Sequence, residues 1–220
     1  MRPLTSAIPK ALLDVQGRPF IAWQLDWIRR QGGRRVVICA GYLGEQIEAE
    51  VGNGGAFGLD VAFVYDGPTL LGTAGALSFA LSALEGGPFF VLYGDSYLPI
   101  PWGPVQDVFD ASGRLALMTV YRNDDRLDRS NVEFDDGRIV AYDKRRRSRR
   151  MRHIDYGLGL LRPEALPGPP ADTPSDLASV YAALLARGEL VAYEVQERFY
   201  EIGSPEGLEA TRRLLAGKSS

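Results

Sequence analysis

Apolar and polar residues follow two different periods along the first part of the chain. From Arg18 to Gln31 apolar side chains recur every three or four positions, which predicts an amphipathic helix with an aromatic stripe facing a core. Runs with the period of a helix and short apolar runs of strand length then alternate. Strands are predicted at 35–40, 60–65 and 88–93, and helices at 43–51 and 74–84. Such alternation is typical of βαβ units and predicts an α/β, Rossmann-like fold whose mostly parallel sheet is flanked by helices.

The pattern changes after Leu115, where predicted strands follow one another closely. Strands at 131–134 and 138–142 are joined by Asp135-Asp136-Gly137, and an Asp-Gly pair suits a hairpin turn. We therefore expect a small antiparallel insertion at about residues 115–165 within a single domain that spans 1–220. No linker is long enough to separate two independent domains.

The last part of the chain returns to helix and strand. Thr173-Pro174-Ser175-Asp176 predicts a helix start with Thr173 as its cap and the proline in the first turn. A strand at 190–195 and a terminal helix at 205–215 follow.

Composition adds limits on function. The 220 residues are 45% hydrophobic and 24% charged, with a net charge of −3, which fits an ordinary globular protein and argues against wholesale nucleic-acid binding. No apolar run approaches the roughly 18 residues needed to span a bilayer, and the start does not resemble a signal peptide, so we expect a cytoplasmic protein. The one cysteine, Cys39, lies in an apolar run and is expected in the core.

Five short segments carry the candidate chemistry. They are R-P-L-T-S-A-I-P-K ending at Lys10, L-G-T-A-G-A starting at Leu71, L-Y-G-D ending at Asp95, D-K at 143–144 and Y-E-I-G-S-P starting at Tyr200. In this order the segments resemble the sugar-1-phosphate nucleotidylyltransferases, with heptose and mannose 1-phosphate guanylyltransferase-like proteins as the nearest subgroup. Because the segments span almost the whole chain, chance similarity is improbable.

The resemblance implies an enzyme of nucleotide-sugar biosynthesis. It implies transfer of a nucleoside monophosphate from a nucleoside triphosphate, with GTP favoured, to a sugar 1-phosphate, which releases pyrophosphate. Such a reaction needs cations and fixed dipoles around several phosphate groups. Lys10 and Asp95 are the implied catalytic residues, and Asp95 with Glu201 are the implied ligands of Mg²⁺, although relatives carry an aspartate where this chain has Glu201.

The resemblance also assigns two sets of binding residues. The nucleotide-binding residues are Leu71, Gly72, Thr73 and Gly75, and the sugar-phosphate-binding residues on the insertion are Asn131, Asp143, Lys144, Asp155 and Gly157. The first set could also be an ordinary turn, and the second could be hairpin and strand-end residues. No general base is evident, and His153 is expected to be structural or exposed.

Other functions stay open at this stage. The family's G-G-x-G-T-R-L loop should precede Arg2 but is absent, so we expect a further strand and loop upstream, or else a non-catalytic nucleotide-sugar-binding regulator or inactive homologue. A glycosyltransferase is disfavoured because Asp95-Ser96-Tyr97 lacks a second acid. The basic run 144–152 has no interleaved aromatic residues and lies in an acidic chain, so we expect an exposed loop that attracts anionic substrates and no nucleic-acid partner. No membrane partner is expected either, and a homo-oligomer is left open.

Overall fold

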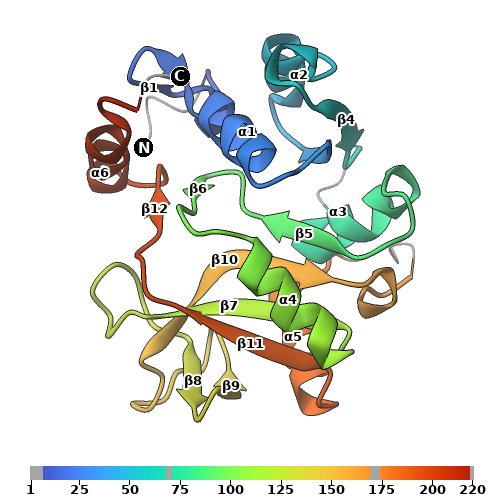
Figure 1. Ribbon diagram of the computed structural model, residues 1–220, viewed down its shortest axis with the longest axis vertical. Coiled ribbons are helices and arrows are strands. Elements are labelled where there is room, and N and C mark those ends of the chain that lie inside the picture. Colours follow the sequence, from blue (N-terminus) through green and yellow to red (C-terminus); the bar gives the residue numbers. More distant parts are fainter. Residues whose placement is uncertain (1–6, 68–70, 169–173, 219–220) are drawn as a thin grey trace. The chain divides into compact units, whose positions relative to one another are not determined.

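The computed structural model describes residues 7–67, 71–168 and 174–218. The chain forms two compact units, each assembled from separate stretches of sequence (Figure 1). Unit 1 is drawn from Met1–Pro68, Tyr93–Pro99 and Phe199–Ser220, and unit 2 from Thr69–Leu92 and Ile100–Arg198. Alternating helices and strands confirm the expected α/β class.

Unit 1 contains short strands and three helices within its described residues. Its elements are η1 (Lys10–Leu12), β1 (Asp14–Val15), β2 (Arg18–Pro19), α1 (Phe20–Arg30), β3 (Arg35–Ala40), α2 (Gly44–Val51), η2 (Gly55–Phe57), β4 (Asp60–Tyr65), β6 (Ser96–Tyr97), β12 (Tyr200–Glu201) and α6 (Pro205–Leu215). The aromatic stripe of α1 is core, as predicted, because Phe20 and Trp23 pack with Ile202 of the C-terminal stretch. This packing and the antiparallel pairing of β12 with β6 join the C-terminal stretch to the rest of unit 1.

The parallel pair β3–β4 confirms the two strands predicted at 35–40 and 60–65, and Arg35 lies opposite Asp60 in its register. The prediction for Cys39 was wrong, because this residue is exposed. Of the residues of β3 only Ala40 is fully buried, so an apolar run of strand length did not imply a core position for each residue.

Unit 2 is built around a six-stranded sheet. Its elements are α3 (Gly72–Ala80), η3 (Leu81–Ala83), β5 (Phe89–Leu92), α4 (Gly103–Ser112), β7 (Ala116–Arg122), β8 (Val132–Asp135), β9 (Arg138–Tyr142), β10 (His153–Leu161), η4 (Pro163–Ala165), α5 (Leu177–Ala186) and β11 (Leu190–Val195). The strand order is β11-β7-β10-β8-β9, and β5 pairs with β10.

This sheet is mixed rather than mostly parallel. Only β11 pairs in parallel with β7, whereas β10 runs antiparallel to β5, β7 and β8. The reason is the run of short connections after β7, since short loops reverse the chain direction and parallel pairing needs a longer crossover. The predicted hairpin between β8 and β9 is confirmed, with Asp136 and Gly137 both at positive φ.

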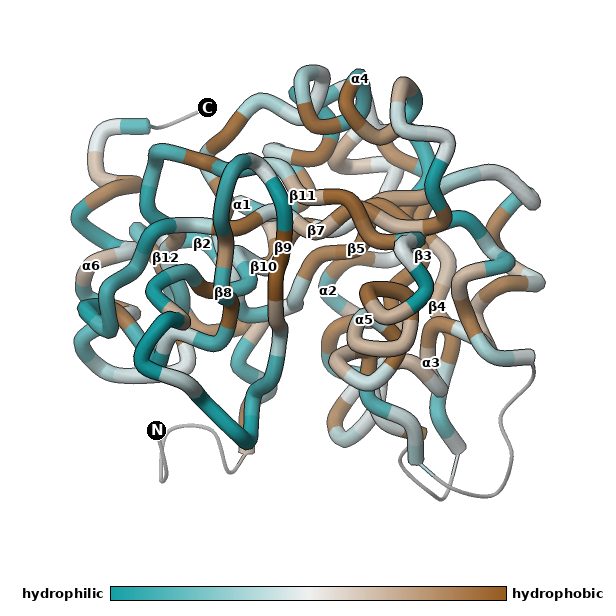
Figure 2. Tube along the Cα trace, turned by 90° about the horizontal axis from the view of Figure 1, so that it is seen from below, coloured by the Kyte–Doolittle hydropathy of each residue, from teal (hydrophilic) through white to brown (hydrophobic). Residues whose placement is uncertain are grey.

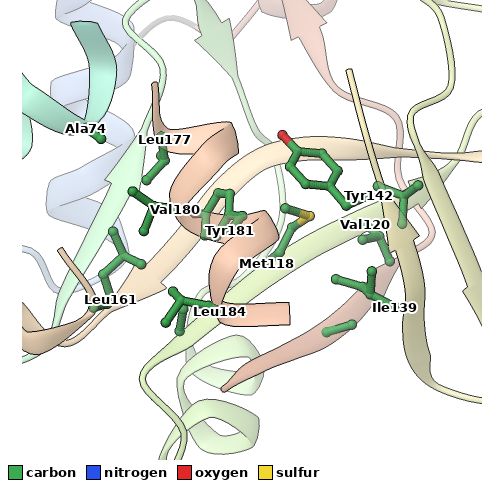
Figure 3. Packing of buried hydrophobic residues seen from close by; sticks show 14 of the residues in the cluster. Ala74, Met118, Val120, Ile139, Tyr142, Leu161, Leu177, Val180, Tyr181 and Leu184 are labelled. Atoms are coloured by element: carbon green, nitrogen blue, oxygen red, sulfur yellow. The ribbon is translucent and has the colours of Figure 1, made fainter. Parts of the chain in front are cut away.

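Helices cover both faces of the sheet. Leu177, Val180, Tyr181 and Leu184 of α5 pack on Met118 and Val120 of β7, as Figure 3 shows. Helix α4 lies over the opposite face (Figure 1), toward which the alternation of β7 directs Leu117. Strands β5 and β7 are mostly brown in Figure 2, as expected of strands that pack against a core.

The start of α5 differs from the prediction. The helix begins at Leu177, and the side chain of Asp176 caps it by accepting a hydrogen bond from Ala178 N. Pro174 therefore precedes the helix instead of forming its first turn, and Thr173 lies outside the described residues. Aspartate is as good an N-cap as threonine, so composition alone did not select between the two positions.

No helix among the described residues is long and apolar enough to cross a membrane.

Candidate functional site

Strand pairing brings two predicted acidic residues together in unit 1. Glu201 of β12 lies opposite Ser96 of β6, and Ile202 N donates to the carbonyl oxygen of Asp95 at 3.0 Å. Asp95 and Glu201 thus come from segments about a hundred residues apart in sequence and meet through a two-stranded ladder.

The side chains of Asp95, Glu201 and Lys10 converge at the position that a Cβ atom of Gly203 would occupy. A methyl group placed on Gly203 would lie 2.7 Å from Glu201 Oε2, 3.6 Å from Asp95 Oδ2 and 3.7 Å from Lys10 Nζ. Lys10 Nζ and Asp95 Oδ2 are 3.8 Å apart, and each side chain keeps more than 40% of its surface exposed. The structure therefore places three predicted catalytic and metal-binding residues around one accessible point.

The start of α6 holds the Glu201 carboxylate in place. Oε2 accepts hydrogen bonds from the backbone N–H of Gly203 and from Ser204 N, the latter at 3.1 Å, and Oε1 accepts from Ser204 Oγ at 2.6 Å. Ser204 Oγ in turn accepts from Gly207 N at 2.9 Å and so caps the helix. The Glu201 side chain therefore folds back onto the start of α6.

The two carboxylates suit Mg²⁺, which needs few protein ligands, rather than a metal ion that is held by protein ligands alone. Among the residues that the structure describes, no three His, Cys, Asp or Glu side chains gather into a cluster that could hold a metal ion. Mg²⁺ is commonly held by one or two carboxylates, with water and substrate phosphates as its remaining ligands. The two carboxylates near Gly203, those of Asp95 and Glu201, match this ligand set.

The predicted nucleotide residues form the start of α3 in unit 2. Gly72 has a φ of 73°, and a Cβ there would lie 2.5 Å from the carbonyl oxygen of Ser175. The backbone N–H groups of Ala74 and Gly75 donate to this same oxygen. Gly72 is thus required by a left-handed turn and by close approach of the chain at Ser175, which the sequence did not reveal.

Four of the five predicted sugar-phosphate-binding residues are joined by hydrogen bonds in unit 2. Asn131 accepts from Asp143 N through its backbone oxygen and from Asp155 N through its side chain, both at 3.0 Å. Gly157, at a φ of 96°, donates to Asp155 Oδ1, and Tyr142 OH lies 3.4 Å from Asp155 Oδ2. The structure brings these residues together, and it also gives most of their polar atoms a structural partner.

The loop that starts at Asp143 is rich in basic residues. Asp143 Oδ1 accepts from the backbone N–H groups of Arg145 and Arg146, and these bonds with the two guanidinium charges hold the pKa of Asp143 below its ordinary value. Lys144 is exposed on the same turn. Asp143 therefore shapes the turn that presents Lys144.

Farther along, the basic run is neutralised by acids of unit 2. Arginine–carboxylate pairs join Arg147 to Asp125, Arg150 to Glu133 and Arg152 to Asp124. These pairs support the interpretation of the run as an exposed loop.

His153 has a structural environment. It is buried, its Nε2 lies 3.0 Å from Glu194 Oε1, and its ring packs on Phe134. The sequence named no partner for this histidine because Glu194 lies 41 residues away on β11.

Sequence reasoning missed three residues that shape these sites. Gly203 and Ser204 stand inside a quoted segment, but only the fold shows that Gly203 keeps a space open and that Ser204 holds Glu201. Asp176 entered the prediction only as the last residue of the segment that starts a helix, whereas its side chain caps α5 and also accepts a hydrogen bond from Thr73 Oγ1. A helix-cap search would have found Asp176 and Ser204 as caps but not their second contacts.

Comparisons with known proteins agree on one family. Residues 4–145 match the family described as the MobA-like NTP transferase domain. N-acetylmuramate α-1-phosphate uridylyltransferase of Neisseria meningitidis is 44% identical over 95 residues, which are 43% of this chain and 41% of that protein. The β catalytic subunit of mannose-1-phosphate guanylyltransferase of Drosophila pseudoobscura is 27% identical over 94% of this chain. The chain spans 56% of the length of that relative.

Solved structures share the fold. A Bacillus anthracis protein assigned as a glucose-1-phosphate thymidylyltransferase superposes with a TM-score of 0.86 at 17% identity, over 100% of this chain and 92% of its own. The inositol-1-phosphate CTP transferase of T. maritima superposes with a TM-score of 0.78 at 19% identity, over 100% and 93%.

Proposed function

Because the chain belongs to the MobA-like NTP transferase family, we propose that it transfers a nucleoside monophosphate from a nucleoside triphosphate to a sugar 1-phosphate and releases pyrophosphate. The observation that carries this proposal is the convergence of Lys10, Asp95 and Glu201 at Gly203. A cation beside two carboxylates is the arrangement that phosphoryl chemistry with a divalent metal requires.

Each group in unit 1 has a definite task in this proposal. Asp95 and Glu201 would hold Mg²⁺, which when bound neutralises phosphate charge. Lys10 places a compact ammonium charge where negative charge develops as the sugar phosphate attacks the α-phosphorus. A general base is not required, because a phosphate monoester with a second pKa near 6 is largely dianionic at pH 7. Orientation and charge neutralisation then supply the catalysis.

Unit 2 supplies the binding residues in this proposal. The start of α3, with Leu71, Gly72, Thr73 and Gly75, binds the nucleotide and selects its base. Lys144 binds the sugar phosphate, while Asn131, Asp143, Asp155 and Gly157 shape the sugar side. The hydrogen bonds that join Asn131 to Asp143 and Asp155 support this grouping.

GTP is the first nucleotide to test and UTP the second. The relative that covers 94% of this chain is named a guanylyltransferase, and the one that is 44% identical over 95 residues is named a uridylyltransferase. The sugars in those two names, mannose and N-acetylmuramate 1-phosphates, are the first acceptors.

A panel assay of pyrophosphate release tests the proposal. Four nucleoside triphosphates are combined with these acceptors, glucose 1-phosphate and no acceptor, with Mg²⁺ present throughout. We expect release only with both substrates present and none with Asp95→Asn. Tight nucleotide binding without release under any combination would favour a non-catalytic nucleotide-sugar-binding protein instead.

A further inference from the structure

The first turn of α3 and the segment that starts α5 are tied together in unit 2. Ser175 N donates to Leu71 O at 2.8 Å, and Ser175 O accepts from Ala74 N and Gly75 N at 2.9 and 3.3 Å. Ala74 and Leu177 also lie next to each other in the buried core (Figure 3). Segments about a hundred residues apart therefore share one hydrogen-bonded turn.

Side chains complete this junction. Thr73 Oγ1 accepts from Leu177 N at 2.8 Å and lies 3.1 Å from Asp176 Oδ1, to which it donates. The same carboxylate oxygen accepts from Ala178 N at 3.0 Å. Thr73 therefore caps α5, and one carboxylate oxygen of Asp176 accepts hydrogen bonds from both Ala178 N and Thr73 Oγ1.

A helix cap alone does not explain this arrangement. Capping α5 requires only the bond from Ala178 N, which serine or asparagine would also provide. The additional bond to Thr73 fixes the side chain in the middle of the turn that begins at Gly72. That turn has a left-handed residue and no space for a Cβ beside Ser175, so its shape depends on contact with this segment.

The charge of Asp176 also faces the sugar-phosphate loop. Lys144 and Arg145 both act electrostatically on this carboxylate, beside the bonds from Ala178 N and Thr73. One acid therefore interacts with both predicted binding loops of unit 2, and it also caps the N-terminus of α5, whose dipole favours an anion.

We propose that Asp176 is a positioning residue that holds the Leu71–Gly75 turn in its nucleotide-binding shape through the hydroxyl group of Thr73. The inference rests on the proposed function, because it assumes that this turn binds the nucleotide. Asp176 itself contacts no reacting atom in this account. Loss of the Asp176–Thr73 contact weakens nucleotide binding more than it weakens sugar 1-phosphate binding.

Three variants separate positioning from capping. Thr73→Val removes the hydroxyl, and Thr73→Ser retains it. Asp176→Ser retains an N-cap for α5 but withdraws the carboxylate from Thr73. The matched control is Ser179→Ala, which removes the bond from Ser179 Oγ to the backbone oxygen of Asp176 in the same helix turn without touching Thr73.

The measurements are binding of GTP and UTP with Mg²⁺ by calorimetry, KM and kcat for both substrates, and the melting temperature. We expect Thr73→Val and Asp176→Ser each to raise the nucleotide Kd and KM about fivefold to tenfold, the scale of one hydrogen bond. Thr73→Ser should restore most of this loss. The double variant Thr73→Val with Asp176→Ser should be no worse than the poorer single variant, since both single changes remove the same Thr73–Asp176 hydrogen bond.

Equal loss with Ser179→Ala, or a fall in melting temperature with unchanged nucleotide Kd, would overturn the positioning role. Equal changes in the KM of both substrates would overturn it as well. Calorimetry measures binding without turnover, so a chain that binds GTP or UTP but releases no pyrophosphate would refute the proposed transfer while still testing the role of Asp176.

Discussion

Gly203→Ala is the sharpest perturbation of the candidate catalytic centre. The glycine is not in a left-handed conformation, so alanine meets no backbone strain there. Its new methyl group would lie 2.7 Å from Glu201 Oε2, whereas ordinary contact begins near 3.4 Å. The Glu201 oxygen must therefore move by about 0.7 Å, while Asp95 and Lys10 lose the open space between them.

The size of the effect follows from these contacts. Glu201 loses part of its bonds to Gly203 N and Ser204, and a bond to a charged group contributes about 1.5–3 kcal/mol, so we expect destabilisation of roughly 1–2 kcal/mol. Displacement of a catalytic group by about 1 Å costs on the order of 100-fold in rate, so activity should fall far more than stability.

The assay compares kcat, its dependence on the Mg²⁺ concentration and thermal unfolding. Gly87→Ala is the matched control, since a Cβ at Gly87 meets nothing within 4 Å and its φ is also not left-handed. Full activity and unchanged Mg²⁺ dependence in Gly203→Ala would refute the assignment of this point as the site of phosphate and metal binding.

Three further predictions concern single side chains. Asp95→Asn should lower kcat by orders of magnitude with an unchanged circular dichroism spectrum, because it removes a charge at nearly constant shape. Lys10→Ala should lower kcat more than it weakens nucleotide binding, and Lys10→Arg should rescue poorly because a planar guanidinium replaces a compact ammonium. The hydrogen bonds from Ala178 N and Thr73 Oγ1, with the positive charges of Lys144 and Arg145, lower the folded-state pKa of Asp176. Its stabilising contribution is present above the ordinary pKa near 4 and is lost as pH falls through the lower folded value, so urea unfolding of Asp176→Asn should show a smaller acid-side loss.

Much of the fold could be predicted from periodicity. The strands at 35–40, 60–65 and 190–195 and the helix at 205–215 have the bounds expected, because each shows an unbroken period between clear turn residues. Antiparallel strands were predicted after Leu115, but their pairing with β5 and β11 in one mixed sheet was not, since strand partners depend on contacts between distant segments. Cys39 was misplaced for a related reason: burial depends on which elements cover a strand, and a short apolar run does not show this.

The candidate site was likewise predicted only in part: its residues could be named from the sequence, but the contacts that orient them could not. Lys10, Asp95 and Glu201 were named from short segments, and the fold brings them to one point. The contacts that orient them were not predictable, because Ser204 and Thr73 act through second hydrogen bonds that helix-cap rules do not include. The link from Thr73 to Asp176 spans 103 residues and carries no local signal.

The fate of radioactive phosphorus from the nucleotide tests the central claim most directly. The protein is incubated with Mg²⁺, an acceptor sugar 1-phosphate and GTP or UTP labelled at either the α or the γ position. The account predicts that the α label appears in a nucleotide sugar and the γ label in pyrophosphate. Transfer of the γ label to the sugar, or its release as inorganic phosphate with no labelled nucleotide sugar, would contradict it.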